Sequence, residues 1–366
     1  MDKLFSPLTL PRGPAFKNRF ALAPLTNRQS PLGTLSPEEE RWLTMRAEGG
    51  FALTMTCAAH VQAGGQGFPG QLAVFSDDHL PGLARLAAAI RRAGSVSSVQ
   101  LHHAGCRSPR DLVAAPVCPS DSAEHGARGL TLSEVEALVE AFVAAAVRCD
   151  RAGVDGVEIH GAHGYILGQF LSPATNRRTD RYGGSPENRA RIIHEIIAGV
   201  RARCRPAFQL GLRISPERFG VQLEDMVALA RAVLAGGQLD YLDVSLWDVC
   251  KEPEEAAFKG RTLLSYFAGL DRGATRLGVA GKVRTPADAA AALEAGADFV
   301  LLGRAAILNH DFPRRAADPA WAPAAPPVTR AHLREEGLGE AFVEYMAEPL
   351  WSGFVREGGE EGAAQK

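Results

Sequence analysis

The sequence predicts an α/β protein built as a (β/α)8 TIM barrel, with extended loops after the third and fourth strands and a C-terminal tail. Eight short apolar segments alternate with longer helical patterns, and eight parallel strands are the number that closes such a barrel. The first segment is not followed by a G-x-G-x-x-G pattern, which disfavours a doubly wound dinucleotide-binding sheet. The 366 residues exceed a minimal barrel of about 250 residues, so we expect the surplus in the loops and the tail.

The candidate strands are short apolar runs bounded by polar or glycine-containing segments. They cover residues 20–24, 51–57, 96–101, 154–160, 207–214, 239–245, 276–280 and 298–302. Ser36, Ser185 and Thr285 each precede a proline, and this pattern predicts a helix that begins at the proline. Ser133 and Glu136 have the spacing of a capping box and predict another helix start.

Composition and charge exclude several classes of protein. The chain has 40 basic and 42 acidic residues and a net charge of −2, whereas proteins that grip nucleic acid through its phosphates usually carry a basic excess. The sequence contains no run of 18 apolar residues, so no membrane span is expected. The six cysteines are scattered without a C-x-x-C pair, which disfavours a disulfide framework, a zinc site and an iron–sulfur cluster. Reduced thiols in a cytoplasmic protein are therefore expected.

The length is compatible with two domains, but the alternating pattern favours one. We expect a single barrel domain over residues 1–315 and a C-terminal extension over residues 316–366. The extension begins with the Pro/Ala-rich segment 317–327, which is typical of a linker or an extended arm.

The fourth candidate strand runs into the sequence His160-Gly-Ala-His163-Gly-Tyr165. Chemistry in such barrels is placed at the C-terminal ends of strands, so these rings are candidate catalytic groups. Histidines that only hydrogen-bond within their own loop are one alternative. Zinc is another, but the first strand offers no H-x-H ligands, so we expect no metal. The remaining interpretation is a pair of hydrogen-bond donors for an oxygen with partial negative charge, and a tyrosine hydroxyl that gives a proton to a basic carbon.

Two further strands carry polar residues among apolar neighbours. Arg213 lies near the end of the fifth candidate strand, and a buried guanidinium needs an anionic partner, for which a structural ion pair is one explanation. Gln100 shares side-chain parity with Ser98 and His102, so it can point into the barrel mouth, where its amide suits a heterocycle.

The turns after the last two strands contain glycine and arginine. They read Gly281-Lys282-Val283-Arg284 and Gly303-Arg304. Barrel enzymes often bind a phosphate group at this place, although an ordinary strand-to-helix turn is the alternative.

Taken together, these segments resemble the Old Yellow Enzyme family of FMN-dependent ene-reductases, also called NADH:flavin oxidoreductases. The N-terminal stretch LFSPLTL…FKNRFALAPLT resembles the family's first signature, and EIHGAHGYILGQFLSPATNRRTDRYGGSPENRARI (158–192) is similar to its most specific motif. VQLHHAG (99–105) and FVLLGRAAI (299–307) also fit. The resemblance covers roughly residues 1–315 in order, and it implies that this barrel binds FMN.

The resemblance implies a role for each candidate site residue. The cofactor-binding residues would be Ala23, Pro24, Leu25, Thr26, Ala58, Gln100, His160, Arg213, Val283, Arg284, Gly303 and Arg304. NADH or NADPH would be the reductant, and the substrate would be an activated alkene, meaning an α,β-unsaturated carbonyl or nitro compound. His160 and His163 would hold its oxygen, Tyr165 would protonate its α-carbon, and Arg28 would lie in its pocket. Relatives are commonly dimers or tetramers, so a homo-oligomer is expected, with neither nucleic acid nor membrane as a partner.

The chain departs from the pattern at three positions that bear on the substrate. Members with His-x-x-His often have Cys where this chain has Thr26, and a tyrosine near the position of Arg28. Cys57 replaces a residue that is often acidic in relatives. An FMN barrel for another substrate class, of the demethylase or dienoyl type, therefore stays open as an alternative. A flavin-dependent tRNA reductase is a further alternative, which the net charge of −2 disfavours.

Overall fold

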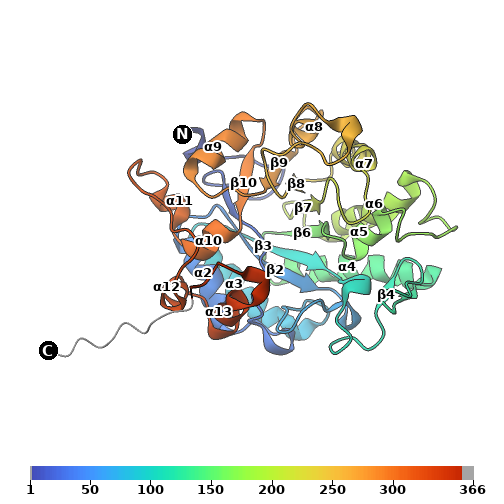
Figure 1. The fold of residues 1–366 in the computed structure, drawn as a ribbon. Coiled ribbons are helices and arrows are strands. Elements are labelled where there is room, and N and C mark those ends of the chain that lie inside the picture. Colours follow the sequence, from blue (N-terminus) through green and yellow to red (C-terminus); the bar gives the residue numbers. More distant parts are fainter. Residues whose placement is uncertain (1, 357–366) are drawn as a thin grey trace.

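The structure is a computed structural model that describes residues 2–356. Eight parallel strands close a barrel in the order β1-β10-β9-β8-β7-β6-β3-β2 (Figure 1). These strands are β1 (Phe20–Leu22), β2 (Leu53–His60), β3 (Val96–His102), β6 (Gly156–Gly161), β7 (Gln209–Ile214), β8 (Tyr241–Ser245), β9 (Arg276–Ala280) and β10 (Phe299–Leu302). The TIM-barrel prediction is confirmed.

A helix follows each barrel strand and covers its outer face. These helices are α2 (Pro37–Glu48), α3 (Leu80–Arg92), α4 (Leu132–Arg151), α6 (Pro186–Arg203), α7 (Leu223–Ala235), α8 (Ser265–Ala268), α9 (Pro286–Glu294) and α10 (Arg304–Leu308). The extended loops after the third and fourth barrel strands, also predicted, carry the small ribbon of β4 (Val117–Cys118) and β5 (Arg128–Gly129) and the helix α5 (Ile166–Leu171). The remaining helices are α1 (Asp2–Phe5), α11 (Phe312–Arg315), α12 (Arg330–Glu335) and α13 (Glu340–Ala347).

Three of the predicted helix starts are confirmed, and the fourth is wrong by two residues. Ser36, Ser185 and Thr285 each accept a backbone hydrogen bond from the third residue that follows. The capping box of α4 is formed by Thr131 and Glu134, not by Ser133 and Glu136. Thr131 keeps an extended backbone outside the helix, so its hydroxyl can reach the Glu134 amide, whereas Ser133 already lies inside the first turn.

The second strand differs from its predicted range of 51–57 and spans Leu53–His60. It begins with Leu53 opposite Val96 of β3 and continues to His60 opposite His102. The register shifts between Met55 and Ala58, and this irregularity lets β2 follow β3 to the barrel mouth.

The N-terminal segment closes the end of the barrel at which the strands begin. Leu8 and Phe16 pair across a bridge, and the Phe16 ring meets the Phe299 ring edge-on at 5.4 Å. The Gln209 amide in the barrel donates to the Pro14 carbonyl at 2.8 Å. Since this end is plugged by apolar side chains, the C-terminal mouth is the open end of the barrel.

The C-terminal helices α12 and α13 lie beside α2 (Figure 1). The rings of Trp42 on α2 and Phe342 on α13 meet edge-on at 5.0 Å. Arg46 of α2 is fully buried and lies over the Trp42 ring at 3.3 Å. Its guanidinium donates to the carbonyls of Ala306 at 3.0 Å and Glu336 at 2.6 Å, so one cation ties α2, α10 and the C-terminal extension together.

We expect Arg46→Met to lower the free energy of unfolding by about 2–3 kcal/mol. The methionine keeps most of the side-chain volume but leaves the Ala306 and Glu336 carbonyls without their charged donor. Urea denaturation followed by circular dichroism measures the loss. Arg41→Met on the exposed face of the same helix is the control. Equal stability of the two variants would contradict the anchoring role of Arg46.

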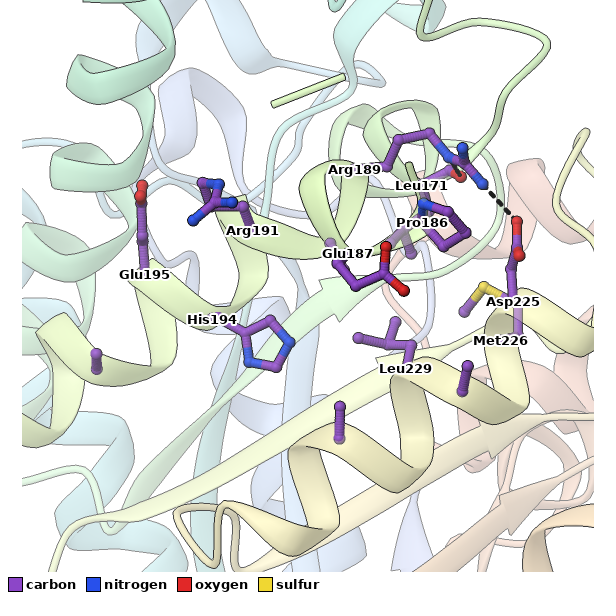
Figure 2. A pocket seen from close by; sticks show the side chains of 14 residues that line it. Leu171, Pro186, Glu187, Arg189, Arg191, His194, Glu195, Asp225, Met226 and Leu229 are labelled. Carbon is purple, nitrogen blue, oxygen red and sulfur yellow. Dashed lines mark hydrogen bonds and ion pairs between the residues drawn. The ribbon is translucent and has the colours of Figure 1, made fainter. Parts of the chain in front are cut away.

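A groove of about 480 Å³ lies between α6 and α7, on the outside of the barrel (Figure 2). Apolar side chains such as Met226 and Leu229 line its floor, and an ion pair between Arg189 and Asp225 spans one end. None of the residues predicted for the site lines this groove. Among residues 2–356, no helix is both long enough and apolar enough to cross a membrane.

Candidate active site

A smaller cavity opens at the C-terminal mouth of the barrel. It is lined by Pro24, Thr26, Ala58, Phe68, Gln100, His102, His160, His163, Tyr165 and Arg213. These side chains come from the ends of β1, β2, β3, β6 and β7 and from the loops that follow them. All of them except Phe68 and His102 belong to the set predicted from the sequence, so the fold brings most of the candidate residues to one place.

The other predicted cofactor-binding residues lie beside this cavity. Ala23 donates its amide to the Leu302 carbonyl at 3.0 Å, so the segment after β1 leaves the barrel alongside the segment after β10. A Cβ atom placed on Gly303 would lie 3.6 Å from the Leu25 side chain, which shows how closely the two segments approach.

Each of the two predicted phosphate-binding turns carries an arginine. Burial lowers the pKa of Arg304, and the positive charge of Arg284 lowers it further. In the part of the chain that the structure describes, neither forms an ion pair. The Arg284 amide is occupied because it donates to Asp288 at 2.9 Å, so the turn that includes Val283 offers the Arg284 side chain rather than this amide.

The histidines are held by a tight turn at the end of β6. His163 has φ of 60° and Gly164 has φ of 69°, a left-handed conformation that is unusual for histidine and easy for glycine. The His163 amide donates to the Ser215 hydroxyl at 2.9 Å, and its Nε2 lies 2.8 Å from the Ser245 hydroxyl. The ring centroids of His160 and His163 are 5.1 Å apart. The turn therefore directs both rings to the same cavity.

Both histidines are neutral at ordinary pH. Burial lowers the pKa of His163 to about 3, and the charges of Arg213 and Arg107 act in the same direction. Burial also lowers the pKa of His160 far below its usual value, with further contributions from His163 and His102. Among the described residues, His160 Nδ1 has no hydrogen-bond partner although it is buried. A neutral imidazole donates through one nitrogen, so His160 can offer a ligand one hydrogen bond, and His163 can offer one through Nδ1 when its Nε2 accepts from the Ser245 hydroxyl.

Tyr165 stands at the rim, between the histidines and an arginine that the sequence analysis missed. Its ring lies 4.4 Å from the His102 ring and 5.4 Å from the His160 ring. The Arg107 guanidinium lies 4.8 Å from the Tyr165 ring centroid and also donates to the His163 carbonyl. Arg107 thus ties Tyr165 to the histidine turn.

Three site residues were absent from the prediction, and one of them could have been found. His102 is two residues after Gln100 on the same strand, so its side chain points to the same face, and its Nδ1 lies 3.1 Å from the Gln71 amide nitrogen. Phe68 and Arg107 come from loops, where no periodic pattern indicates which side chain faces inward.

Arg28, predicted in the substrate pocket, is engaged elsewhere. Its guanidinium forms an ion pair with Glu348 and lies 4.3 Å over the Tyr345 ring of α13. Arg28 is not among the residues that line the mouth cavity, and its backbone is left-handed with φ of 57°. Its role in substrate binding stays a prediction.

Below the cavity, Gln100 and Arg213 are bound to carboxylates inside the barrel. The Gln100 amide donates to Glu158 Oε1 at 2.7 Å. Arg213 Nε lies 3.0 Å from Asp243 Oδ2. Arg213 therefore has the anionic partner that a buried guanidinium needs, and at the same time it lines the cavity.

We expect the free energy of unfolding to fall as the pH drops from about 6.5 towards 3. Burial lowers the pKa of both His103 and His163 to about 3, so below pH 6.5 the unfolded chain binds protons that the folded chain does not. Each such histidine contributes about 1.4 kcal/mol per pH unit within this window, and the contribution is fully present above it.

Urea denaturation at several pH values between 7 and 4 measures this slope. His103→Gln keeps an acceptor for the Gly105 amide, which now donates to His103 Nδ1 at 3.0 Å, but cannot take up a proton. The slope should be smaller in this variant by the contribution of one histidine. An equal dependence of the free energy of unfolding on pH in the two proteins would contradict the low pKa of His103 in the folded state.

Comparison with known proteins supports the fold and identifies the family. The model of the NADH:flavin oxidoreductase / NADH oxidase family matches residues 3–320. The "probable NADH-dependent flavin oxidoreductase YqiG" of Bacillus subtilis (strain 168) is 36% identical, over 97% of this chain and 96% of its own length. Morphinone reductase in complex with tetrahydroNAD has a TM-score of 0.79 at 27% identity, covering 98% of this chain and 99% of that one. An Old Yellow Enzyme homologue from Zymomonas mobilis has a TM-score of 0.79 at 26% identity, covering 94% of this chain and 99% of that one.

The barrel and these similarities define a class, namely flavin-dependent oxidoreductases built on a TIM barrel. Their cofactor is FMN, and NADH or NADPH is the reductant. Within this class, the chain belongs to the NADH:flavin oxidoreductase / NADH oxidase family, which is the Old Yellow Enzyme family. The resemblance inferred from the sequence motifs is confirmed.

Proposed function

We propose that the protein is an ene-reductase that reduces the carbon–carbon double bond of α,β-unsaturated carbonyl or nitro compounds, with Tyr165 as the proton donor. The observation that carries the proposal is the convergence of two neutral histidines and a tyrosine on one cavity. A hydrogen-bonding pair beside a weak acid suits a substrate in which an oxygen gains charge while a carbon gains a proton.

The mouth of the barrel fits FMN. Pro24, Thr26 and Ala58 are small side chains that line the cavity, which suits the close approach of a flat ring. Gln100 offers an amide, and Arg213 offers a cation to an electron-rich edge of the ring. The positive charges of Arg284 and Arg304, which repel each other, suit the phosphate. When bound, FMN would supply the redox chemistry, which is hydride transfer between NAD(P)H and the alkene.

The residues of the chain bind and polarise the alkene. His160 and His163 donate hydrogen bonds to the carbonyl or nitro oxygen, and these bonds strengthen as negative charge develops there. Burial keeps both rings neutral, so they act as donors without delivering a proton. The Tyr165 hydroxyl gives its proton to the α-carbon, and Arg107 holds the Tyr165 ring in place.

The test measures whether an alkene reoxidises the reduced protein. The purified protein should be yellow and should be bleached by NADH or NADPH without oxygen. 2-Cyclohexenone and a nitroalkene should restore the colour within seconds and be recovered as saturated products. Cyclohexanone, which has no double bond, is the matched control and should not restore it. Failure of every activated alkene to reoxidise the protein would reject the proposal. The oligomeric state, expected to be a dimer or a tetramer, stays a prediction.

A further inference from the structure

Two carboxylates lie inside the barrel, directly below the mouth cavity. Glu158 on β6 and Asp243 on β8 are both fully buried. Neither lines the cavity, so neither is placed to touch a substrate. Buried carboxylates are unfavourable unless they are paired, so their position needs an explanation.

Each carboxylate contacts one of the two polar residues that line the floor of the cavity. Strand register places Glu158 opposite Gln100 and Asp243 opposite Arg213. Glu158 accepts the Gln100 amide at 2.7 Å, and Asp243 lies 3.0 Å from Arg213 Nε. The carboxylates therefore act on the cavity through these two side chains.

The pair is incompletely satisfied by the rest of the barrel. Among the described residues, Glu158 Oε2 and both Asp243 oxygens make no hydrogen bond of good geometry, although the Tyr241 hydroxyl is near enough to stabilise the Glu158 carboxylate. Burial raises the pKa of Glu158, and repulsion from Asp243 raises it further. Burial also raises the pKa of Asp243; Arg213 opposes the shift at both carboxyls, but only Glu158 is raised further by its neighbour, so Asp243 is the carboxyl that ionises first.

A purely structural purpose does not explain this arrangement. A buried ion pair is often no more stable than well-packed apolar residues of similar volume. Asp243 and Arg213 do not meet as an aligned, fully hydrogen-bonded pair, because Arg213 Nε has no hydrogen bond of good geometry. What the pair does change is the charge that Arg213 presents to the cavity.

We propose that Asp243 and Glu158 are positioning residues for the flavin: Asp243 offsets part of the Arg213 charge and so lowers the reduction potential of bound FMN, while Glu158 orients the Gln100 amide. This inference rests on the proposed placement of Gln100 and Arg213 against the flavin. Reduced flavin carries more negative charge than oxidised flavin, so a fully exposed Arg213 charge favours the reduced form. Asp243 moderates that preference.

The test is the reduction potential of the holoenzyme, measured by equilibration with a redox dye at pH 7. Asp243→Asn keeps the shape of the side chain but removes its charge. We expect the ratio of reduced to oxidised flavin at a fixed potential to rise about tenfold, which is about 30 mV for a two-electron couple. Asp240→Asn is the control because Asp240 is equally buried but precedes β8, at the opposite end of the barrel, where it pairs with Arg12 and Arg201.

Arg213→Met separates this inference from the proposed placement of Arg213. A lower potential in Arg213→Met together with an unchanged potential in Asp243→Asn overturns the inference alone. Unchanged potentials in both variants overturn the placement of Arg213 as well. A rise in Asp240→Asn equal to that in Asp243→Asn also overturns the inference. If Asp243→Asn does not fold, Asp243→Ser removes the same charge and leaves room for water.

The FMN dissociation constant tests the second half of the inference. Glu158→Gln retains a carbonyl acceptor for the Gln100 amide and should bind FMN as the wild type does. Glu158→Leu removes the acceptor, so FMN should bind about tenfold more weakly. Equal FMN affinity in Glu158→Leu and wild type would overturn the orienting role of Glu158, and weakened binding in Glu158→Gln would do so too.

Discussion

The double substitution His160→Ala with His163→Ala is expected to abolish the long-wavelength charge-transfer band that appears when a phenol binds over the flavin. The same variant should lose at least about a hundredfold in kcat/KM for 2-cyclohexenone, since the loss of one preorganised donor to a developing oxyanion typically costs a factor of 10²–10³. Both effects have one cause, because the phenol oxygen and the carbonyl oxygen would accept the same two hydrogen bonds.

The cavity explains why the effect should be large. Both rings line it, and their centroids are 5.1 Å apart, so the double substitution removes two imidazole donors from one part of the cavity. Burial lowers the pKa of His163 to about 3, so the donor is already neutral throughout the working pH range. Wild-type kcat/KM should accordingly show no histidine titration near pH 6.5. Protonation near that pH in the wild type would contradict the neutral-donor role.

Titration with a phenol, followed by absorbance, measures the band. His125→Ala, which removes an exposed histidine from the loop after β3, is the control and should keep both the band and the activity. FMN content must be measured in each variant, because loss of flavin would also remove the band. An unchanged band in a fully loaded double variant would refute the assigned role of the two histidines.

The fold was predictable because its signal is local and repeated. Eight strands of a parallel barrel are buried on both faces, so each leaves a short apolar run, and the turns between them carry caps such as Ser185 and Thr285. The wrong predictions concern the boundaries of elements whose ends depend on a neighbouring element. The end of β2 at His60 depends on pairing with β3, and the capping box of α4 depends on where the chain leaves the β5 ribbon.

The site was predictable to the extent that it lies on strands. Gln100, His160 and Arg213 lie on strands, where successive side chains alternate between the two faces. The direction of each side chain therefore follows from its position in the strand. The sequence also indicated that Arg213 needs an anionic partner, but it did not indicate which carboxylate is that partner. Asp243 is 30 residues away, and its contact with Arg213 arises only from the register of β7 and β8. The partners of Arg28, which come from the C-terminal extension, left no sequence pattern at all.

Tyr165→Phe is expected to slow reoxidation of the reduced protein by 2-cyclohexenone by about 10²–10⁴-fold, while reduction by NAD(P)H stays within about threefold of the wild type. The reason is chemical, because only the alkene needs a proton on carbon, and general acid catalysis is typically worth that factor. The phenylalanine still fills the space between His102 and Arg107, so the cavity keeps its shape. Stopped-flow absorbance of the flavin resolves the two half-reactions.

Two comparisons make the result specific to proton transfer. Tyr266→Phe removes a hydroxyl that donates to the Phe258 carbonyl at 2.7 Å in the loop after β8, and should leave both half-reactions unchanged. A quinone accepts electrons without protonation at carbon, so it should reoxidise Tyr165→Phe at the wild-type rate. If the quinone and the enone slowed equally, or if both half-reactions slowed by the same factor, the hydroxyl would be shaping the site rather than donating the proton. Retention of wild-type enone rates would assign the proton to another group, and His102, the remaining ring in contact with Tyr165, would be the next residue to replace.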